Sequence, residues 1–153
     1  MGKEPIMTVK DIQQKLKKYC ADCRPVAPNI YFYVWESDFL AIRKSGFAEE
    51  FEIKLTKADF KADARKQKIG LTKYEWLSRG AGPTYFSYVV PEGLVLATEV
   101  PEFAGLYWVK GDLRYSIREV KKPRRLNKTK LTLEQLVDIY KSIYYRYFIN
   151  KKQ

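Results

Sequence analysis

The sequence predicts an α/β protein in which a mixed central β-sheet is flanked by helices. Segments with the apolar spacing of amphipathic helices lie near both ends of the chain, and segments rich in β-forming residues lie between them. The length of 153 residues suits one domain with a sizeable core. Residues 1–153 are therefore expected to form a single domain, and the order of helices and strands favours a mixed sheet.

Four helices are expected, each opened by a Thr and an acidic or Gln residue three positions later, which is the spacing of a capping box. These pairs are Thr8 with Asp11 for a helix over 8–21, Thr56 with Asp59 for a basic helix over 57–68, Thr72 with Glu75 for a short helix ended by Gly80 or Gly82, and Thr132 with Gln135 for the last helix. The last helix carries a wide apolar stripe that we expect to pack on the sheet. The stripe consists of Leu133, Leu136, Val137, Tyr140, Tyr144, Tyr147 and Phe148.

Two strands are expected to form a central antiparallel hairpin. Residues 30–42 run out, Gly46 supplies the positive φ of the turn, and residues 47–55 run back. Pro25 and Pro28 exclude a helix or a central strand from the preceding segment, 24–29, which is expected to be a connecting loop. Further strands are expected at 85–90 and 105–109, with an edge strand over 115–120.

Charged residues occur at unusual places in this hairpin. Strand alternation puts Glu50, Glu52 and Lys54 on one face of the returning strand, opposite an apolar face. Taken alone, that pattern is typical of a solvated face. Asp38, however, lies in an almost wholly apolar strand, where a carboxylate is costly to bury without a cation. The hairpin would set Asp38 against Glu52 and Lys54.

Asp38, followed after thirteen residues by Glu52-Ile53-Lys54, resembles the PD-(D/E)XK nuclease superfamily. The resemblance runs from about Trp35 to Val109 and is strongest to small nucleases of phages and bacteria. It implies a single-domain restriction-endonuclease-like fold, in which the acidic strand and the E-x-K strand form a metal-dependent site. Ser37 stands where the family has its proline.

The resemblance implies that Asp38, Glu52 and Lys54 are the catalytic residues of a Mg²⁺- or Mn²⁺-dependent deoxyribonuclease, which would be an endonuclease. The metal ligands would be Asp38, Glu52 and the backbone carbonyl of Ile53, and Lys54 would orient or help to deprotonate the attacking water. The family's first helix often supplies a glutamate. None is present here, so the choice between one metal and two stays open.

The charge balance favours a partner made of phosphates. Lys and Arg number 29 against 18 Asp and Glu, a formal net charge of +11, and neutralising phosphates releases counterions. DNA is the expected partner, although solvated charge runs are also common. The expected phosphate-contacting residues are Lys61, Arg65, Lys66 and Lys68 in the basic helix, and Lys121, Lys122, Arg124, Arg125 and Lys128 in the loop over 121–130.

The histidine and cysteine content limits the possible catalytic and metal-binding chemistry, and the lack of long apolar runs bears on the location of the protein. The absence of histidine excludes Ser-His-Asp and Cys-His catalysis and His-ligated zinc. Cys20 and Cys23 form a lone C-x-x-C, interpreted as two reduced thiols, with a zinc shared across a homodimer as the second interpretation. No apolar run is long enough to cross a bilayer and no signal region is evident, so a cytoplasmic protein is expected, in the host cell if phage-encoded.

Three functions are therefore open. The first is a metal-dependent nuclease acting on DNA. The second is a nucleic-acid-binding module of the same fold without catalysis, suggested by the absent helix glutamate. The third is a basic RNA-binding protein in which Glu52 and Lys54 are only a surface ion pair.

Overall fold

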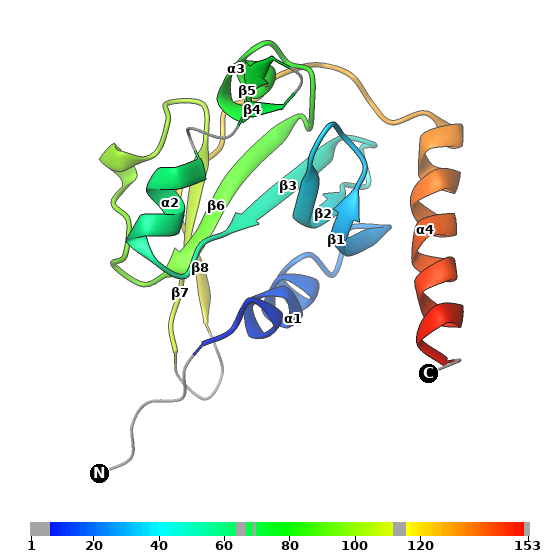
Figure 1. The fold of residues 1–153 in the computed structure, drawn as a ribbon, viewed down its shortest axis with the longest axis horizontal. Coiled ribbons are helices and arrows are strands. Elements are labelled where there is room, and N and C mark those ends of the chain that lie inside the picture. Colours follow the sequence, from blue (N-terminus) through cyan, green and yellow to red (C-terminus); the bar gives the residue numbers. More distant parts are fainter. Residues whose placement is uncertain (1–6, 64–66, 69, 112–115, 152–153) are drawn as a thin grey trace.

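A six-stranded mixed sheet forms the centre of the structure, a computed structural model that describes residues 7–63, 67–68, 70–111 and 116–151 (Figure 1). The first three strands of the sheet are antiparallel, the third, fourth and fifth are parallel, and the sixth returns antiparallel. In spatial order the strands are β1 (Val26–Tyr31), β2 (Glu36–Ile42), β3 (Ala48–Ile53), β6 (Tyr85–Pro91), β7 (Gly105–Val109) and β8 (Ile117–Lys121). This arrangement confirms the predicted α/β class with a mixed sheet flanked by helices.

Helices and a small hairpin surround the sheet. The described helical segments are α1 (Val9–Tyr19), α2 (Lys57–Asp63), α3 (Lys73–Ser78), a 3-10 turn η1 (Ala97–Glu99) and α4 (Leu133–Lys151), and the hairpin pairs β4 (Gln67–Lys68) with β5 (Leu71–Thr72). No described helix is both long and apolar enough to cross a membrane.

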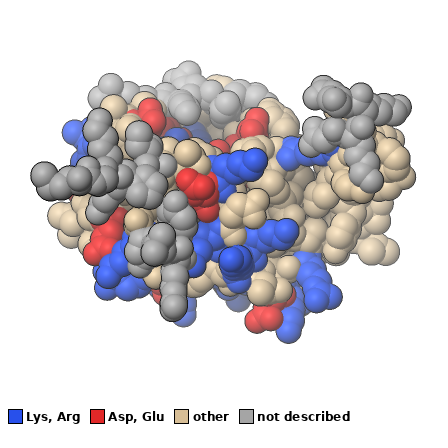
Figure 2. Space-filling view, turned by 90° about the horizontal axis from the view of Figure 1, so that it is seen from below, with Lys and Arg blue, Asp and Glu red and all other residues tan. Residues whose placement is uncertain are grey.

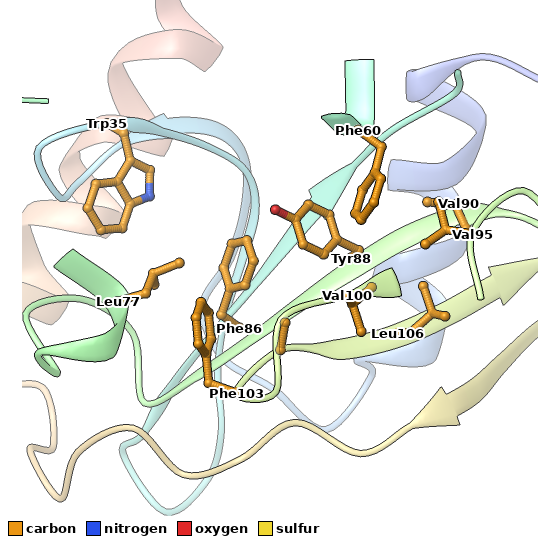
Figure 3. Packing of buried hydrophobic residues seen from close by; sticks show 11 residues of the cluster. Trp35, Phe60, Leu77, Phe86, Tyr88, Val90, Val95, Val100, Phe103 and Leu106 are labelled. Atoms are coloured by element: carbon orange, nitrogen blue, oxygen red, sulfur yellow. The ribbon is translucent and has the colours of Figure 1, made fainter. Parts of the chain in front are cut away.

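The two faces of the sheet are covered by different elements. On one face α1 packs Ile12 and Leu16 against Phe51 of β3 and Tyr107 of β7. On the other face α2 and α3 cover an aromatic core, in which the ring of Tyr88 lies between Phe60 and Phe86 (Figure 3). Because both faces are covered, the central strands β3 and β6 are buried almost throughout.

The predicted helix starts are confirmed. Asp11 N donates to Thr8 Oγ1 at 3.1 Å, and Thr8 N donates back to Asp11 Oδ2 at 2.9 Å, which completes a capping box. The other three helices also have the expected threonine hydroxyl accepting a backbone N–H. The basic helix is shorter than expected, because α2 ends at Asp63 and Gln67–Lys68 is a strand.

The predicted loop over 24–29 is wrong for most of its length, and the predicted strand over 30–42 is two strands. β1 begins at Val26 and pairs antiparallel with β2, so the chain turns between Tyr31 and Glu36. β1 is an edge strand, where a proline such as Pro28 is tolerated because a backbone N–H is not needed on both sides.

The predicted packing of the last helix is also largely wrong. Of the predicted stripe only Leu136 is partly buried, and it packs beside Ile139 and Ile143 against the β1 side of the sheet. The helix meets the sheet through a different face from the one expected. The stripe residues that are exposed instead are Leu133, Val137, Tyr140, Tyr144, Tyr147 and Phe148.

Candidate functional site

The polar face of β3 is buried. Glu50, Glu52 and Lys54 are only 0%, 7% and 7% exposed, so the solvated face and the surface ion pair considered from the sequence are both wrong. β3 lies between β2 and β6, and α2 and α3 cover this face. Charges in such a position must find partners within the protein.

Lys73 supplies one of those partners. Its Nζ lies 2.9 Å from Glu50 Oε2 and 3.0 Å from Glu52 Oε2, so a single ammonium bridges two carboxylates of one strand. Lys73 is the first residue of α3, where the Thr72 cap fixes its backbone. The aromatic rings of Phe86 and Trp35 also face this ammonium, with centroids 4.9 and 5.3 Å from Nζ.

Lys54 is held on two sides. Its Nζ lies 3.1 Å from Glu52 Oε1 and 3.2 Å from Asp63 Oδ1 at the end of α2. The Tyr88 hydroxyl donates to Asp63 Oδ2 at 2.7 Å, which fixes that carboxylate in turn. These contacts leave Lys54 little freedom to move. We call Glu50, Glu52, Lys54, Asp63 and Lys73 together the buried charge network.

Burial and pairing act against each other in the titration of this network. Burial raises the pKa of Glu50 by more than Lys73 lowers it, so this pKa lies above the ordinary glutamate value. Burial alone would lower the pKa of Lys73, but Glu50 and Glu52 outweigh that effect and raise it above the ordinary lysine value. The pKa of Lys54 is raised in the same way, with burial opposed by Glu52 and Asp63. Both lysines are therefore ammonium ions at neutral pH.

Asp38 lies beside the network on β2. The antiparallel register pairs Leu40 with Glu50 and Phe39 with Phe51, and its continuation brings Asp38 opposite Glu52. Asp38 Oδ2 accepts a hydrogen bond from Ile53 N at 2.8 Å. Burial and the neighbouring Glu52 raise the pKa of Asp38 to about 6. The structure thus brings together the four predicted site residues.

The donor set suits one hard cation with few protein ligands. Within the described residues no cluster of three or more His, Cys, Asp or Glu side chains could hold a metal ion. The donors that the predicted site offers are two carboxylates, Asp38 and Glu52, and the Ile53 carbonyl, and Mg²⁺ often takes so few protein ligands. Four carboxyl groups lie in and beside the network, against two ammonium groups. Cys20 and Cys23 form no disulfide.

Three residues that contact the site, Lys73, Asp63 and Trp35, were not predicted from the sequence. Lys73 follows a helix cap and Asp63 lies within a basic helix, so each resembles an ordinary surface residue. Trp35 donates from Nε1 to both oxygens of Glu50, at 2.9 and 3.1 Å, but looks like a plain core residue in the sequence. Only the packing of α2 and α3 onto β3 brings these side chains to the site.

The loop over 121–130 is anchored to the body of the protein. Asn127 Nδ2 donates to the carbonyls of Gly80 and Gly82, and Leu126 N donates to Thr84 O. The predicted phosphate contacts Lys122, Arg124, Arg125 and Lys128 are exposed along this loop, whereas Lys121 is half-buried and donates to Pro101 O. Of the basic helix, Lys61 is exposed, Arg65 and Lys66 lie outside the described residues, and only the backbone of Lys68 is described.

The structure adds a basic surface that the sequence did not single out. Figure 2 shows Lys and Arg side chains gathered over the middle of the face seen from below. α1, at the bottom of Figure 1, exposes Lys10, Lys17 and Lys18. The pattern of a helix with lysines between its apolar residues could have indicated this surface.

Comparisons with known proteins bear on the fold alone. No protein-family model matches the sequence. The search of curated proteins gives no significant match either. The structure is similar to the SPO1766 protein of unknown function from Silicibacter pomeroyi, with a TM-score of 0.55 and 16% identity over 83% of this chain and 76% of that chain. At this identity the likeness shows a shared fold.

Proposed function

We propose that the protein is a metal-dependent endonuclease that hydrolyses phosphodiester bonds in DNA. The observation that carries the proposal is the meeting of Asp38 with the Glu52-Ile53-Lys54 strand at a buried site rich in carboxyl groups. Catalytic sites of this kind concentrate carboxylates and lysines away from water, because their interactions are then stronger. A phage or bacterial protein acting in the cytoplasm is consistent with this proposal.

Each residue has a distinct task in the proposed reaction. Asp38, Glu52 and the Ile53 carbonyl would hold Mg²⁺ or Mn²⁺, which when bound supplies Lewis acidity and an activated water. Lys54, fixed by Glu52 and Asp63, would orient the attacking water and offset charge that develops on the phosphoryl group. Asp63 and Tyr88 act by positioning Lys54.

DNA is the proposed partner because the formal charge of +11 would drive binding through counterion release. Exposed cations lie on α1, on α2 and along the loop over 121–130. These residues would hold the backbone and carry no sequence information themselves.

A second candidate, nucleic-acid binding without cleavage, is favoured by one observation. Lys73 Nζ lies between Glu50 and Glu52, and Lys54 occupies the other oxygen of Glu52. A cation at Glu52 would therefore have to share both carboxylate oxygens with ammonium groups. Cleavage assays separate the two candidates.

The test is single-turnover cleavage of supercoiled, linear and single-stranded DNA at saturating protein, with Mg²⁺, Mn²⁺ or chelator. The parent should cut only with metal, and Lys54→Ala should slow cutting by about 100- to 1,000-fold, because one preorganised electrostatic contact is lost. DNA affinity should stay close to that of the parent. Lys44→Ala, which removes an exposed lysine from the turn before β3, is the matched control and should cut normally.

The outcomes decide between the candidates. Normal cutting by a folded Lys54→Ala variant means that the β3 strand is not the catalytic site. Tight DNA binding by the parent, without cutting under any metal, establishes the binding module instead. Circular dichroism of each variant confirms that a loss of rate is not a loss of fold.

A further inference from the structure

Helix α4 has two apolar faces, of which its own chain covers one. The inner face consists of Leu136, Ile139 and Ile143, which pack with Leu40 and Ile42 of β2. Arg146 also donates to backbone carbonyls of β1, at Pro28 and Asn29. Ile139 is nevertheless the only side chain in the described part of α4 that is fully buried. Helices in proteins gain most of their stability from packing, so this is little burial for 19 residues.

The other face carries regularly spaced apolar residues in contact with water. We call Leu133, Val137, Tyr140 and Tyr144 the outer stripe; they are 78%, 42%, 52% and 59% exposed. Their spacing of four, three and four residues is the 3.5-residue repeat of helices that pack along one another, and Tyr147 continues it. The inner face does not share these positions. The outer stripe therefore has the pattern of a helix-pairing seam.

This exposure is concentrated in one place. Of the eleven large hydrophobic residues that are exposed in the described part of the chain, eight belong to α4. Figure 2 shows the lobe at the right, where Figure 1 places α4, as largely tan. Soluble monomers rarely expose a contiguous apolar patch of this kind.

The charges beside the stripe suit the same helix running in the opposite direction. Glu134 and Lys141 lie seven residues apart and flank the outer stripe on the same side of α4. Antiparallel pairing of two copies sets acidic residues near basic ones, and a two-fold axis presents the same stripe from both partners. In a parallel pair the equivalent flanks lie on opposite sides of the seam, so Glu134 of one helix could not meet Lys141 of the other.

We propose that the outer stripe of α4 is the interface of a homodimer in which two α4 helices pair antiparallel about a two-fold axis. The stripe is thereby buried in the assembly, and the inner face keeps its contacts with the sheet. Metal, DNA and catalysis have no part in this pairing. Its test is therefore independent of the proposed nuclease function.

The experiment is sedimentation velocity on the full chain, without metal or DNA, over concentrations up to about 100 µM, which detects dimers of moderate affinity. The parent should sediment as a dimer whose fraction rises with concentration. The double substitution Tyr140→Ser, Tyr144→Ser should raise the dimer Kd by about tenfold or more, since buried aromatic anchors dominate interfaces. Tyr145→Ser is the matched control: it removes a 64%-exposed tyrosine from the same helix but away from the stripe, and should dimerise as the parent does.

Circular dichroism must show that the variants keep their helix content. A parent that is monomeric throughout overturns the proposal, and vesicle or single-stranded DNA binding that depends on Tyr140 would then assign the stripe to lipid or to base stacking. A double variant that dimerises as tightly as the parent also overturns it. So does a control that dissociates as readily as the double variant.

Discussion

Strand β3 buries charged side chains, whereas helix α4 exposes aromatic ones. Glu50 on β3 is fully enclosed, although glutamate is among the residues most often found in water. Tyr140 and Tyr144 on α4 are more than half exposed, although large aromatic side chains usually lie inside. Both regions thus reverse the ordinary relation between residue type and burial.

The two regions differ in what offsets the unfavourable burial or exposure of their side chains. On β3 the compensation is internal, because every carboxylate of the network has an ammonium within 3.2 Å. On α4 the described part of the chain offers no cover for the outer stripe. A buried charge needs an oppositely charged partner within the folded chain, whereas an exposed apolar stripe can be covered later, when another molecule binds. This contrast points to a site within the chain at β3 and to an interface between chains at α4.

The largest expected change in stability follows from removing Lys73, the cation that pairs with Glu50 and Glu52. Lys73→Met should lower the free energy of unfolding by about 3 to 5 kcal/mol, because Glu50 would stay buried without its cation. Urea denaturation followed by circular dichroism measures the change. Adding Glu50→Gln should recover much of the loss, since the uncompensated charge is then removed while Trp35 keeps an acceptor.

Lys44→Met is the control, because it removes an 80%-exposed lysine at no comparable cost. A loss below about 1 kcal/mol for Lys73→Met would show that Glu50 is protonated in the fold and that no ion pair forms. Burial of Glu50 on β3 would then not depend on a compensating cation.

Local sequence patterns predicted most of the fold. The threonine caps fixed four helix starts, because a cap depends on residues three positions apart. Strand alternation correctly separated Phe51 and Ile53 from Glu50 and Glu52. β1 was missed because a proline on an edge strand looks the same in the sequence as a proline in a loop.

The site and α4 were harder to predict, for related reasons. Sequence alternation finds the face on which Glu52 lies, but burial of that face depends on where α2 and α3 dock. Lys73 joins the site only through that docking. For α4, apolar periodicity cannot tell the face that packs on its own sheet from a face that awaits a partner. The burial of Ile139 identifies the face of α4 that packs on the sheet, and this burial is known only from the structure.

A smaller effect on the free energy of unfolding is expected from Asp38, which lies beside the buried charge network. Asp38 has a pKa of about 6 in the fold, above the ordinary value of 3.8, so its ionisation opposes folding. The free energy of unfolding should fall as the pH rises from about 4 to about 6, since the folded state binds more protons over that range. Asp38→Asn removes this dependence. In chelator at pH 7 the variant should be more stable than the parent by about 1 to 2 kcal/mol, after allowance for solvent screening.

Urea denaturation between pH 4 and 8 measures this difference, which should vanish near pH 4. Asp59→Asn, which removes an exposed carboxylate of α2, is the control and should keep the fall in stability that Asp38 causes between pH 4 and 6. Mg²⁺ should stabilise the parent and not Asp38→Asn if Asp38 is a ligand. Equal stabilisation of the parent and of Asp38→Asn by Mg²⁺ would show that Asp38 is not a metal ligand. The ion pairs of β3 would then remain as its unusual feature.

The smallest effect concerns the direction of the α4 pair. Glu134 and Lys141 are seven residues apart and so flank the outer stripe on the same side. In an antiparallel pair each can face the other on the partner helix. Glu134→Lys or Lys141→Glu alone should then weaken the dimer by less than about 1 kcal/mol, and the double exchange should restore it.

Sedimentation at low salt measures these variants, because screening removes interactions between exposed charges. In a parallel pair the equivalent flanks of the two helices lie on opposite sides of the seam, so Glu134 and the partner's Lys141 could not meet and the double exchange would restore nothing. Weakening by both single variants with recovery in the double variant is therefore specific to the antiparallel arrangement. Additive weakening in the double variant would leave the stripe as the interface but exclude that direction, because charge exchange restores only pairs that face each other.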